Sequence, residues 1–456
     1  MAKANQNQTH YTRQVQVLLS KIYGHSILND SVLERAVNFY QQNEFVATDE
    51  AISAESQTLQ KLEQAERHNH IQSISDEILD LAEGDSFEES NKKSAQLLGT
   101  IQLISPTEGR AVAKNNELCK SLYKAVLSLR LLEHLLLNNK ISDPYITKVL
   151  AEFEGKPYAD FDVSERARVR NLLKIPLVMA ALLQDIGHNH PAGQKILLGE
   201  DGQQNPYRTL EVEQRKQLLR LNHTHTLAYI SNGLAIPSYT GNSKADRDQF
   251  IIDENFKHKL LKQLIKTSFQ AKEGIGNLLK VPQIYVSIIF STKDTYNYKV
   301  LPKVYQVLNK NAELGACSPL FVDALYQITG MFPQGYGVIY MPEDELGQQG
   351  DCYEYAIVNR LYPKDPEQPL CRIATRKLAF IGHGHNIEIK KNNNLYFPQM
   401  AKKVAKLSKE RLNEILELLS SNYQERQQLD LLPRCWHANE FFSAKAHQKL
   451  WNRTDK

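Results

Sequence analysis

One apolar stretch constrains the fold of this chain more than any other: RARVRNLLKIPLVMAALLQDIGH, residues 166–188. Its central part is apolar on every side, which predicts a long helix that is buried rather than a surface helix with one apolar face. Pro176 should break or kink the helix, because proline lacks the amide hydrogen and its ring clashes with the preceding turn. The helix brings Gln184 and Asp185 to its C-terminal end.

The segments before and after this stretch are also predicted to be mostly helical. Residues 49–84 have apolar side chains at helical spacing and a polar face rich in Gln, Glu and Ser, which predicts a helical hairpin or short bundle. Pro, Gly and polar residues at 103–117 mark a first boundary. The run LYKAVLSLRLLEHLLLNN (122–139) predicts an apolar helix that stops at its two asparagines. The run VPQIYVSIIFSTKDTYNY (281–298) fits a buried helix or a strand equally well.

The pattern changes from residue 333, where short β-prone runs alternate with Gly and Pro turns and predict a small antiparallel sheet. Residues 399–428 return to a charged amphipathic helix. We therefore expect a mainly α protein in four parts. These are a helical N-terminal module (1–105), a helical domain (118–332), a small antiparallel β extension (333–390) and a C-terminal helical segment (391–456).

Composition narrows the classes of function. The 456 residues include 55 basic and 52 acidic side chains, a balance that gives no reason to expect nucleic-acid binding. The five cysteines lie far apart without a CxxC pair, which favours a reducing cytoplasm over a disulfide framework. No apolar segment near the N-terminus looks like a signal peptide, and no window of eighteen apolar residues predicts a membrane span.

The stretch ALLQDIGHNHPAG (181–193) begins a set of polar residues that could bind a divalent metal: Asp185, His188, His190, His223, His225 and Asp294. Imidazole and carboxylate are the usual ligands of such ions. His223 and His225 are two residues apart on a predicted helix, so at most one of them faces a shared cavity. Asp185 could equally cap a helix or pair with a lysine such as Lys195.

The order of the segments closely resembles the HD-GYP family of metal phosphohydrolases. ALLQDIGH is followed by TLEVEQRKQLLRLNH, then by IFSTKDTYNY, and then by CSPLFVDALYQITGMFPQGYGVIY (317–340), which is similar to the segment that closes that family's domain. The resemblance covers roughly residues 118–376. It implies an HD-domain-like helical bundle whose ligands face one cavity and hold one or two metals. It also implies chemistry on a cyclic dinucleotide, in which a metal-bound hydroxide attacks phosphorus.

The resemblance retains some of the family's ligands and loses others. Asp185, His223 and Asp294 fall on ligand positions, and His188 falls where the family has a lysine. Three positions are degenerate, because the family's His-Asp pair becomes Gln184-Asp185, a second Asp becomes Asn297, and the histidine expected near Ser121 is missing. The family's HHE and GYP motifs are also missing. An amide is a weak ligand for a hard divalent ion, so the resemblance implies either no metal or one weakly bound Mn, Fe or Mg ion.

Three readings of function follow. The first is a catalytically degenerate HD-GYP-like protein that acts as a regulatory, ligand-binding or scaffolding module in bacterial signalling. Its partners would be a cyclic dinucleotide and a protein or second copy bound through the N-terminal helices. The second is an active phosphohydrolase, such as a cyclic di-GMP phosphodiesterase, with one metal on Asp185, His188, His223 and Asp294. The third is a purely structural helical protein. The tracts RHNHI (67–71) and GHGHN (382–386) look more like solvent-exposed or packed histidines than ligands.

Overall fold

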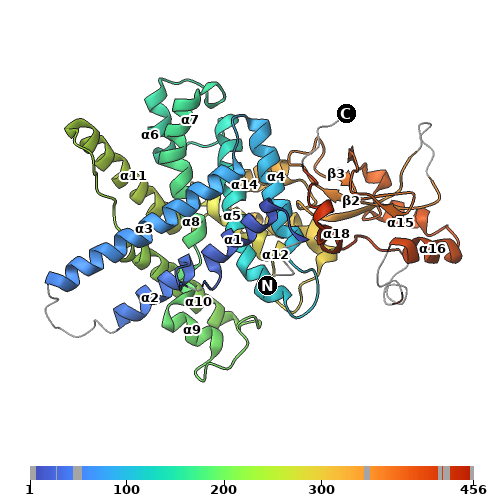
Figure 1. The fold of residues 1–456 in the computed structure, drawn as a ribbon, viewed down its shortest axis with the longest axis horizontal. Helices are drawn as coiled ribbons and strands as arrows, with labels where there is room; N and C mark the ends of the chain where they lie inside the picture. The colour runs from blue at the N-terminus through green and yellow to red at the C-terminus, as the bar shows by residue number, and fades with distance from the viewer. Residues whose placement is uncertain are drawn as a thin grey trace.

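The computed structural model describes residues 7–26, 28–44, 54–343, 350–419, 424 and 432–451. The protein is mainly helical and has a small antiparallel sheet toward its C-terminal end, which confirms the predicted fold class (Figure 1). Helices fill the centre and one end of the molecule, and the sheet with its short helices forms the other end.

The apolar stretch at 166–188 lies at the centre of the molecule. It comprises α7 (Val163–Val169), a π-helical turn (Arg170–Lys174) and α8 (Ile175–Leu183), in which every residue is buried. Pro176 lies in the first turn of α8. The predicted break is confirmed, because the regular α-helix is interrupted just before the proline by the wider π-helical turn. The helix packs against α5 (Val112–Leu137), which ends at Asn138 and Asn139 as the sequence predicts.

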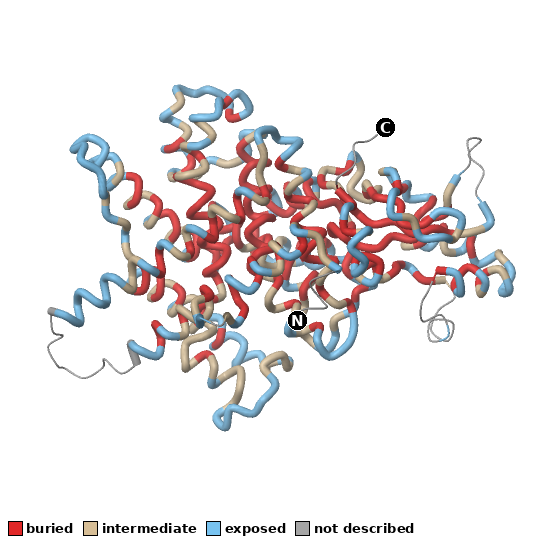
Figure 2. Tube along the Cα trace, viewed as in Figure 1, coloured by how far each residue is buried: buried red, intermediate tan, exposed pale blue. Residues whose placement is uncertain are grey.

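Three N-terminal helices pack against α5, namely α1 (His10–Tyr23), α3 (Ala54–Ala82) and α4 (Phe87–Ile104), and α2 (Val32–Glu44) packs against α1 and α3. The stretch 54–82 forms one 29-residue helix rather than a hairpin. Ile71, Ile74 and Ile78 are buried near its C-terminal end, whereas Leu59 and Leu62 are more than half exposed near its start. Figure 2 shows this contrast between the buried centre of the molecule and the exposed tips of α3 and α11.

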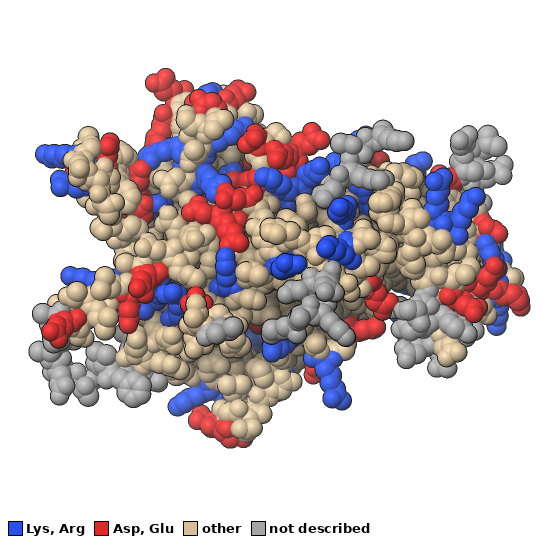
Figure 3. All heavy atoms as spheres, in the orientation of Figure 1, with Lys and Arg blue, Asp and Glu red and all other residues tan. Residues whose placement is uncertain are grey.

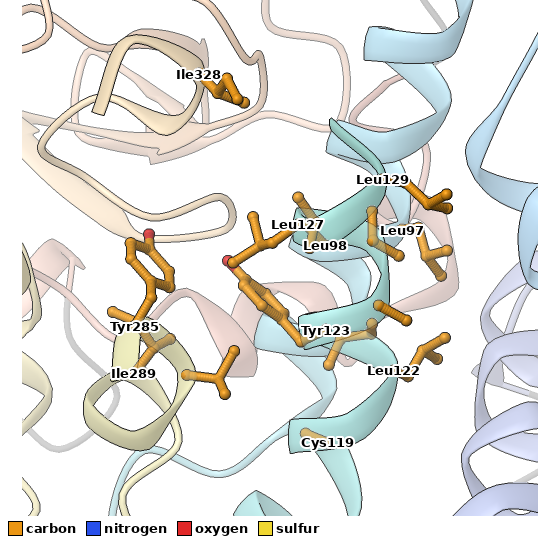
Figure 4. Close-up of a cluster of buried hydrophobic side chains, with 14 of the residues drawn as sticks. Leu97, Leu98, Cys119, Leu122, Tyr123, Leu127, Leu129, Tyr285, Ile289 and Ile328 are labelled. Atoms are coloured by element: carbon orange, nitrogen blue, oxygen red, sulfur yellow. The ribbon is translucent and has the colours of Figure 1, made fainter. Parts of the chain in front are cut away.

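The ambiguous segment 281–298 forms α12 (Asn277–Ile289) followed by a loop and a short 3-10 turn. Tyr285 and Ile289 of α12 meet Tyr123 of α5 in the apolar core, where the two tyrosine rings stack 6.4 Å apart (Figure 4). The other α-helices described before the sheet are α6 (Pro144–Leu150), α9 (Pro191–Leu198), α10 (Val212–Ala228), α11 (Lys244–Ser268), α13 (Val304–Glu313) and α14 (Pro319–Thr329).

The sheet has four antiparallel strands in the order β1 (Gly337–Tyr340), β2 (Glu354–Val358), β3 (Leu370–Ile373) and β6 (Asn386–Glu388). Tyr355 of β2 pairs with Ile339 of β1, and Cys371 of β3 pairs with Ile387 of β6. A separate ribbon joins β4 (Thr375–Arg376) and β5 (Ala379–Phe380).

The helix predicted at 399–428 is two helices in the described part, α15 (Pro398–Val404) and α16 (Lys409–Leu419). Ser408 separates them, because its hydroxyl accepts a hydrogen bond from the amide of Arg411 and so caps α16. Residues 420–423 and 425–428 of that prediction lie outside the described residues. The last elements are α18 (Ala438–Phe442) and a 3-10 turn at Lys445–His447.

The C-terminal segment closes on the start of α1. The Gln448 carboxamide oxygen accepts from the amide of Thr9 at 2.8 Å and from the Thr12 hydroxyl at 3.0 Å, and its nitrogen donates to two main-chain carbonyls. Trp451 covers Gly99 of α4 so closely that a methyl group there would lie 2.4 Å from the indole ring. Both ends of the described chain are therefore built into the core.

The surface has no extended area of one charge on the face that Figure 3 shows, where basic and acidic side chains are interspersed. In the described part of the chain, no helix is both long enough and apolar enough to cross a membrane.

Candidate functional site

Asp185 lies where α8 ends and a 3-10 turn (Ile186–Asn189) begins. One carboxylate oxygen accepts a hydrogen bond from Lys124 Nζ at 2.8 Å, and the other accepts from Gln283 Nε2 at 3.0 Å. Lys124 comes from α5 and its side chain is 1% exposed, while that of Asp185 is 24% exposed. Asp185 therefore pairs with a lysine, as one reading of the sequence allows, but the lysine is Lys124 and not Lys195.

The ion pair fixes the charge of Asp185. Burial alone would raise the pKa of this carboxyl group, but the positive charge of Lys124, with smaller contributions from His188 and Lys120, outweighs burial and lowers the pKa to about 2. The carboxylate is thus ionised at any physiological pH. It already has a cationic partner, supplied by the protein itself.

Gln184 is buried beside Asp185 in a network of neutral amides. Its side-chain nitrogen donates to Gln283 Oε1 at 3.1 Å and to the Ser268 hydroxyl at 3.3 Å. Its main-chain carbonyl accepts from Asn222 Nδ2 at 3.0 Å. Gln283 therefore links Gln184 to Asp185, and α12 is joined to the end of α8 by hydrogen bonds.

Histidines and N-terminal aromatic residues surround the 3-10 turn. His188 has its Nε2 atom buried without a hydrogen-bond partner, and burial lowers its pKa although Asp185 opposes the effect. His190 stacks face to face on His225 with ring centres 3.4 Å apart. Tyr40 of α2 lies edge-on to both rings and donates from its hydroxyl to the carbonyl of His225. The N-terminal helices therefore form part of this site.

The other predicted residues lie in different surroundings. His223 is half-buried and stacks on Phe269 with ring centres 4.6 Å apart, and burial lowers its pKa. His223 and His225 thus face different neighbours, as their spacing predicts. Asp294 is exposed in the loop after α12, and Asn297 caps the next 3-10 turn by accepting from the amide of Lys299. Ser121 is buried on α5, one helical turn before Lys124.

Across the described residues, no group of three or more His, Cys, Asp or Glu side chains is arranged to hold a metal ion. Asp185, His188, His223 and Asp294 are all described, and the structure brings together the first two only. The donors that do meet at Asp185 are an ammonium and a carboxamide nitrogen, neither of which is a ligand for a divalent ion in these protonation states.

Further cations are close enough to the site to interact electrostatically. Lys280 of α12 is influenced by Asp185 and Arg215, and burial lowers its pKa. Lys120 of α5 forms an ion pair with Glu117 at 2.7 Å and also acts on Asp185 and His188. The result is an excess of basic over acidic side chains around Asp185.

Lys293 extends this basic cluster to the loop after α12. Its ammonium donates to the main-chain carbonyl of Arg208 at 2.7 Å, and its charge interacts with those of Lys120 and Arg215 and with the carboxylate of Glu117. Because the carbonyl of Arg208 is uncharged, this hydrogen bond does not neutralise the positive charge of Lys293. We name Lys120, Lys280, Lys293 and Arg215 the basic cluster.

The sequence reasoning missed Lys124, Gln283 and the basic cluster. A signal for Lys124 was present, since a lysine inside the apolar run 122–137 must be buried, and a buried lysine needs a charged partner. Nothing in the sequence pointed to Gln283, because the segment around it fits a strand as well as a helix.

Comparison with known proteins found no match: no family model, no curated protein and no solved structure is similar to this chain.

Proposed function

We propose that this protein is a catalytically degenerate HD-GYP-like module that binds a ligand or partner instead of hydrolysing a phosphodiester. The observation that carries the proposal is the ion pair between Lys124 and Asp185 beside the neutral Gln184. In this proposal the ammonium of Lys124 provides the positive charge that a divalent ion would otherwise bring to Asp185. The protein acts in the cytoplasm, in keeping with five cysteines that are all free thiols.

The ion pair disfavours metal binding for two reasons. A metal ion at Asp185 would be repelled by the ammonium of Lys124 or would displace it, and Lys124 is almost completely buried and would lose its partner. Gln184 offers only an amide oxygen, a much weaker ligand than the imidazole it replaces in the resemblance. Without a metal, no group at the site lowers the pKa of a water molecule enough to make hydroxide at neutral pH.

The basic cluster supports an anionic ligand, and a cyclic dinucleotide is the class that the resemblance suggests. Lysine and arginine are the usual partners of phosphate oxygens. Lys280 is half-buried, in a medium of lower dielectric constant than water. When its ammonium is charged, this medium strengthens its attraction for an anion. The exposed Leu59 and Leu62 of α3 offer a surface for a protein partner or a second copy of the chain.

Titration calorimetry with cyclic di-GMP, run beside a hydrolysis assay with Mn²⁺, tests the proposal. We expect binding without turnover. Lys280→Ala should weaken binding about tenfold, because one charged contact is lost. Lys310→Ala, which removes an exposed lysine of α13, should leave it unchanged. Turnover that disappears in Asp185→Ala would contradict the degenerate reading, and absence of binding would remove the cyclic dinucleotide as the ligand.

A metal-dependent phosphohydrolase is the second candidate. One observation favours it: Nε2 of His188 is buried without a partner close to the ionised Asp185, and such a nitrogen can accept a metal. In this reading Lys124 would swing away when the metal binds. His188→Gln would then abolish Mn²⁺-dependent hydrolysis while the fold remained intact by circular dichroism.

A further inference from the structure

A cleft of about 580 Å³ lies between α2 and the end of the 3-10 turn that follows Asp185. Its walls come from three segments: the loop before α2 at His25 and Asn29, one face of α2 within residues 33–41, and residues 189–194 at the start of α9. α2 packs against the 3-10 turn, so the cleft is shared between the N-terminal helices and the segment after α8. Its volume is within the range of about 300–1,000 Å³ that is usual for small-molecule sites.

Half of the described residues that line the cleft carry a carboxamide: Asn29, Asn38, Gln41, Asn189 and Gln194. Asn189 donates from Nδ2 to the carbonyl of Ile186 at 3.1 Å. Gln194 donates from Nε2 to the carbonyl of His188 at 2.9 Å. These two bonds orient the carboxamides but leave both side-chain oxygens as free acceptors.

The carboxamides on the opposite wall are unused. Asn38 and Gln41 are exposed on α2, and their side chains have no hydrogen-bond partner within the described part of the chain. A carboxamide offers two N–H donors and a carbonyl acceptor, so each of these side chains can both give and receive a hydrogen bond. The cleft therefore presents donors and acceptors on two walls, and those on one wall are already held in place.

The lining carries little charge. The described residues that form it include no Lys, Arg or Asp, and Glu34 is their one carboxylate. Glu34 is already bound by the protein, because it accepts from the amide of Ser26 at 3.2 Å and from the amide of Ser31 at 3.0 Å. The imidazole of His25 lies 3.4 Å from the same carboxylate. An anionic ligand would find no permanent positive charge here, which argues against a phosphate or carboxylate group.

The rest of the lining is mostly aliphatic. Leu33 and Val37 lie one turn apart on α2, and Pro191 begins α9. The described lining residues include no Phe, Tyr or Trp, so a nucleobase would have no such ring on which to stack. A saccharide matches both features of the cleft, because its hydroxyls donate and accept hydrogen bonds and its ring carbons present an apolar C–H face. We propose that this cleft binds a neutral saccharide.

A bound saccharide would contact two parts of the protein at once. Its partners would be Asn38 and Gln41 on α2 and Asn189 in the turn that also carries His188. Binding would therefore add contacts between the N-terminal helices and the turn after Asp185. The lining of the cleft includes no residue of the basic cluster, so the saccharide and the anionic ligand would occupy separate sites.

Saturation-transfer NMR of the full chain with glucose, maltose and trehalose tests the proposal, and calorimetric titration gives the affinity of a sugar that binds. We expect at least one of the three to bind. Asn38→Ala and Gln41→Ala, at exposed positions where folding is not at risk, should each weaken binding about three- to tenfold, because a neutral hydrogen bond is lost. Gln42→Ala removes an exposed carboxamide of α2 outside the lining, so it is the matched control and should change nothing.

Binding that is weakened by Asn38→Ala and Gln41→Ala, and unchanged in Gln42→Ala, supports the proposal. If none of the three sugars bound, or if the double variant Asn38→Ala with Gln41→Ala bound as tightly as the wild type, the proposal would be overturned. Binding lost in Lys280→Ala would place the sugar at the basic cluster and would overturn it as well. The titration with cyclic di-GMP tests the proposed function separately, so the two proposals can fail independently.

Discussion

The side chain of Lys124 is 1% exposed and lies beside Asp185 in the candidate site. Burying an ammonium group costs several kcal/mol, and only a well-placed partner offsets that cost. Lys124 has such a partner in Asp185, 2.8 Å away, and the pair is held further by Gln283. A single buried side chain thus supplies the counter-charge of the Asp185 carboxylate.

Replacing Lys124 with methionine should lower the free energy of unfolding by about 3 kcal/mol, because the Asp185 carboxylate would be left half-buried without its cation. The double variant Lys124→Met with Asp185→Asn should recover most of that loss, since no charge remains unpaired. Urea unfolding at pH 7 measures both. Lys120→Met, on the same helix but with a surface ion pair, serves as the control and should cost less than about 1 kcal/mol. If Lys124→Met and Lys120→Met lowered the free energy of unfolding equally, the buried pair of Lys124 with Asp185 would not stabilise the protein as proposed.

The candidate site depends on how closely α10 approaches the turn after α8. Gly187 lies in that turn, and a methyl group on it would be 2.2 Å from the carbonyl oxygen of Asn222. The amide of Gly187 donates to the Thr226 hydroxyl at 3.1 Å, so the turn is held to α10 at two positions one helical turn apart. This contact positions Gln184 and His188 relative to α10.

Gly187→Ala should therefore push α10 away and lower the free energy of unfolding by about 2 kcal/mol, as overpacking of a close contact does. Gly350→Ala provides the comparison, because a methyl group there meets nothing closer than 3.9 Å and the backbone needs no positive φ. That variant should be neutral within about 0.5 kcal/mol. Thermal unfolding followed by circular dichroism checks the difference, and similar melting temperatures would argue against a close contact.

A buried ionic network joins α5 and the π turn to Glu83, the residue that follows α3. The Glu83 carboxylate accepts from Arg130 Nη2 at 2.8 Å and from Lys174 Nζ at 2.5 Å, and Glu133 pairs with the same arginine. Arg130 is completely buried. Two cations and two carboxylates balance, so removal of one member leaves an uncompensated charge inside the protein.

Glu83→Ala should lower the free energy of unfolding by about 3–5 kcal/mol for this reason. Glu77→Ala, whose carboxylate pairs with Lys21 at the surface, should cost only about 0.5 kcal/mol. Guanidinium unfolding distinguishes the two variants. If Glu83→Ala were as mild as Glu77→Ala, the N-terminal helices would not be anchored through this network.

Elements were easier to predict than contacts. The break at Pro176 and the stop at the two asparagines after Leu137 follow from the covalent chemistry of those residues. The segment around Gln283 could not be assigned, because a short apolar run satisfies both the helix and the strand pattern. It became a helix because Tyr285 and Ile289 pack into the core shared with α5. The pairing of Lys124 with Asp185 joins positions 61 residues apart, and no local pattern encodes that distance.

Across the molecule, many histidines lie in buried or half-buried positions that favour the neutral imidazole. Burial is the largest cause that lowers the pKa of His68, His70, His134, His188, His223, His225 and His258 below its usual value. For His68 the pKa falls to about 4. In the unfolded chain these imidazoles have a pKa of about 6.5. Below that pH the unfolded state therefore binds more protons than the native state.

The free energy of unfolding should therefore fall as the pH is lowered from about 7 toward 4. His68 alone contributes a loss of the order of 3 kcal/mol, which is complete only below its pKa in the folded protein. Unfolding midpoints measured at pH 7.5, 6 and 5 check the direction. His68→Gln should flatten the dependence, because glutamine stays neutral. His383→Gln, at an exposed position, is its control. A midpoint that rises on acidification would contradict the burial of these histidines.

We propose that the ammonium of Lys124 takes the place of a divalent ion at Asp185. Metal analysis of the full chain, purified without chelators and then equilibrated with Mn²⁺, distinguishes this arrangement from a metal site. We expect no stoichiometric metal in the wild-type protein and none in Asp185→Ala. One metal ion per chain in the wild type that is lost in Asp185→Ala would contradict the claim.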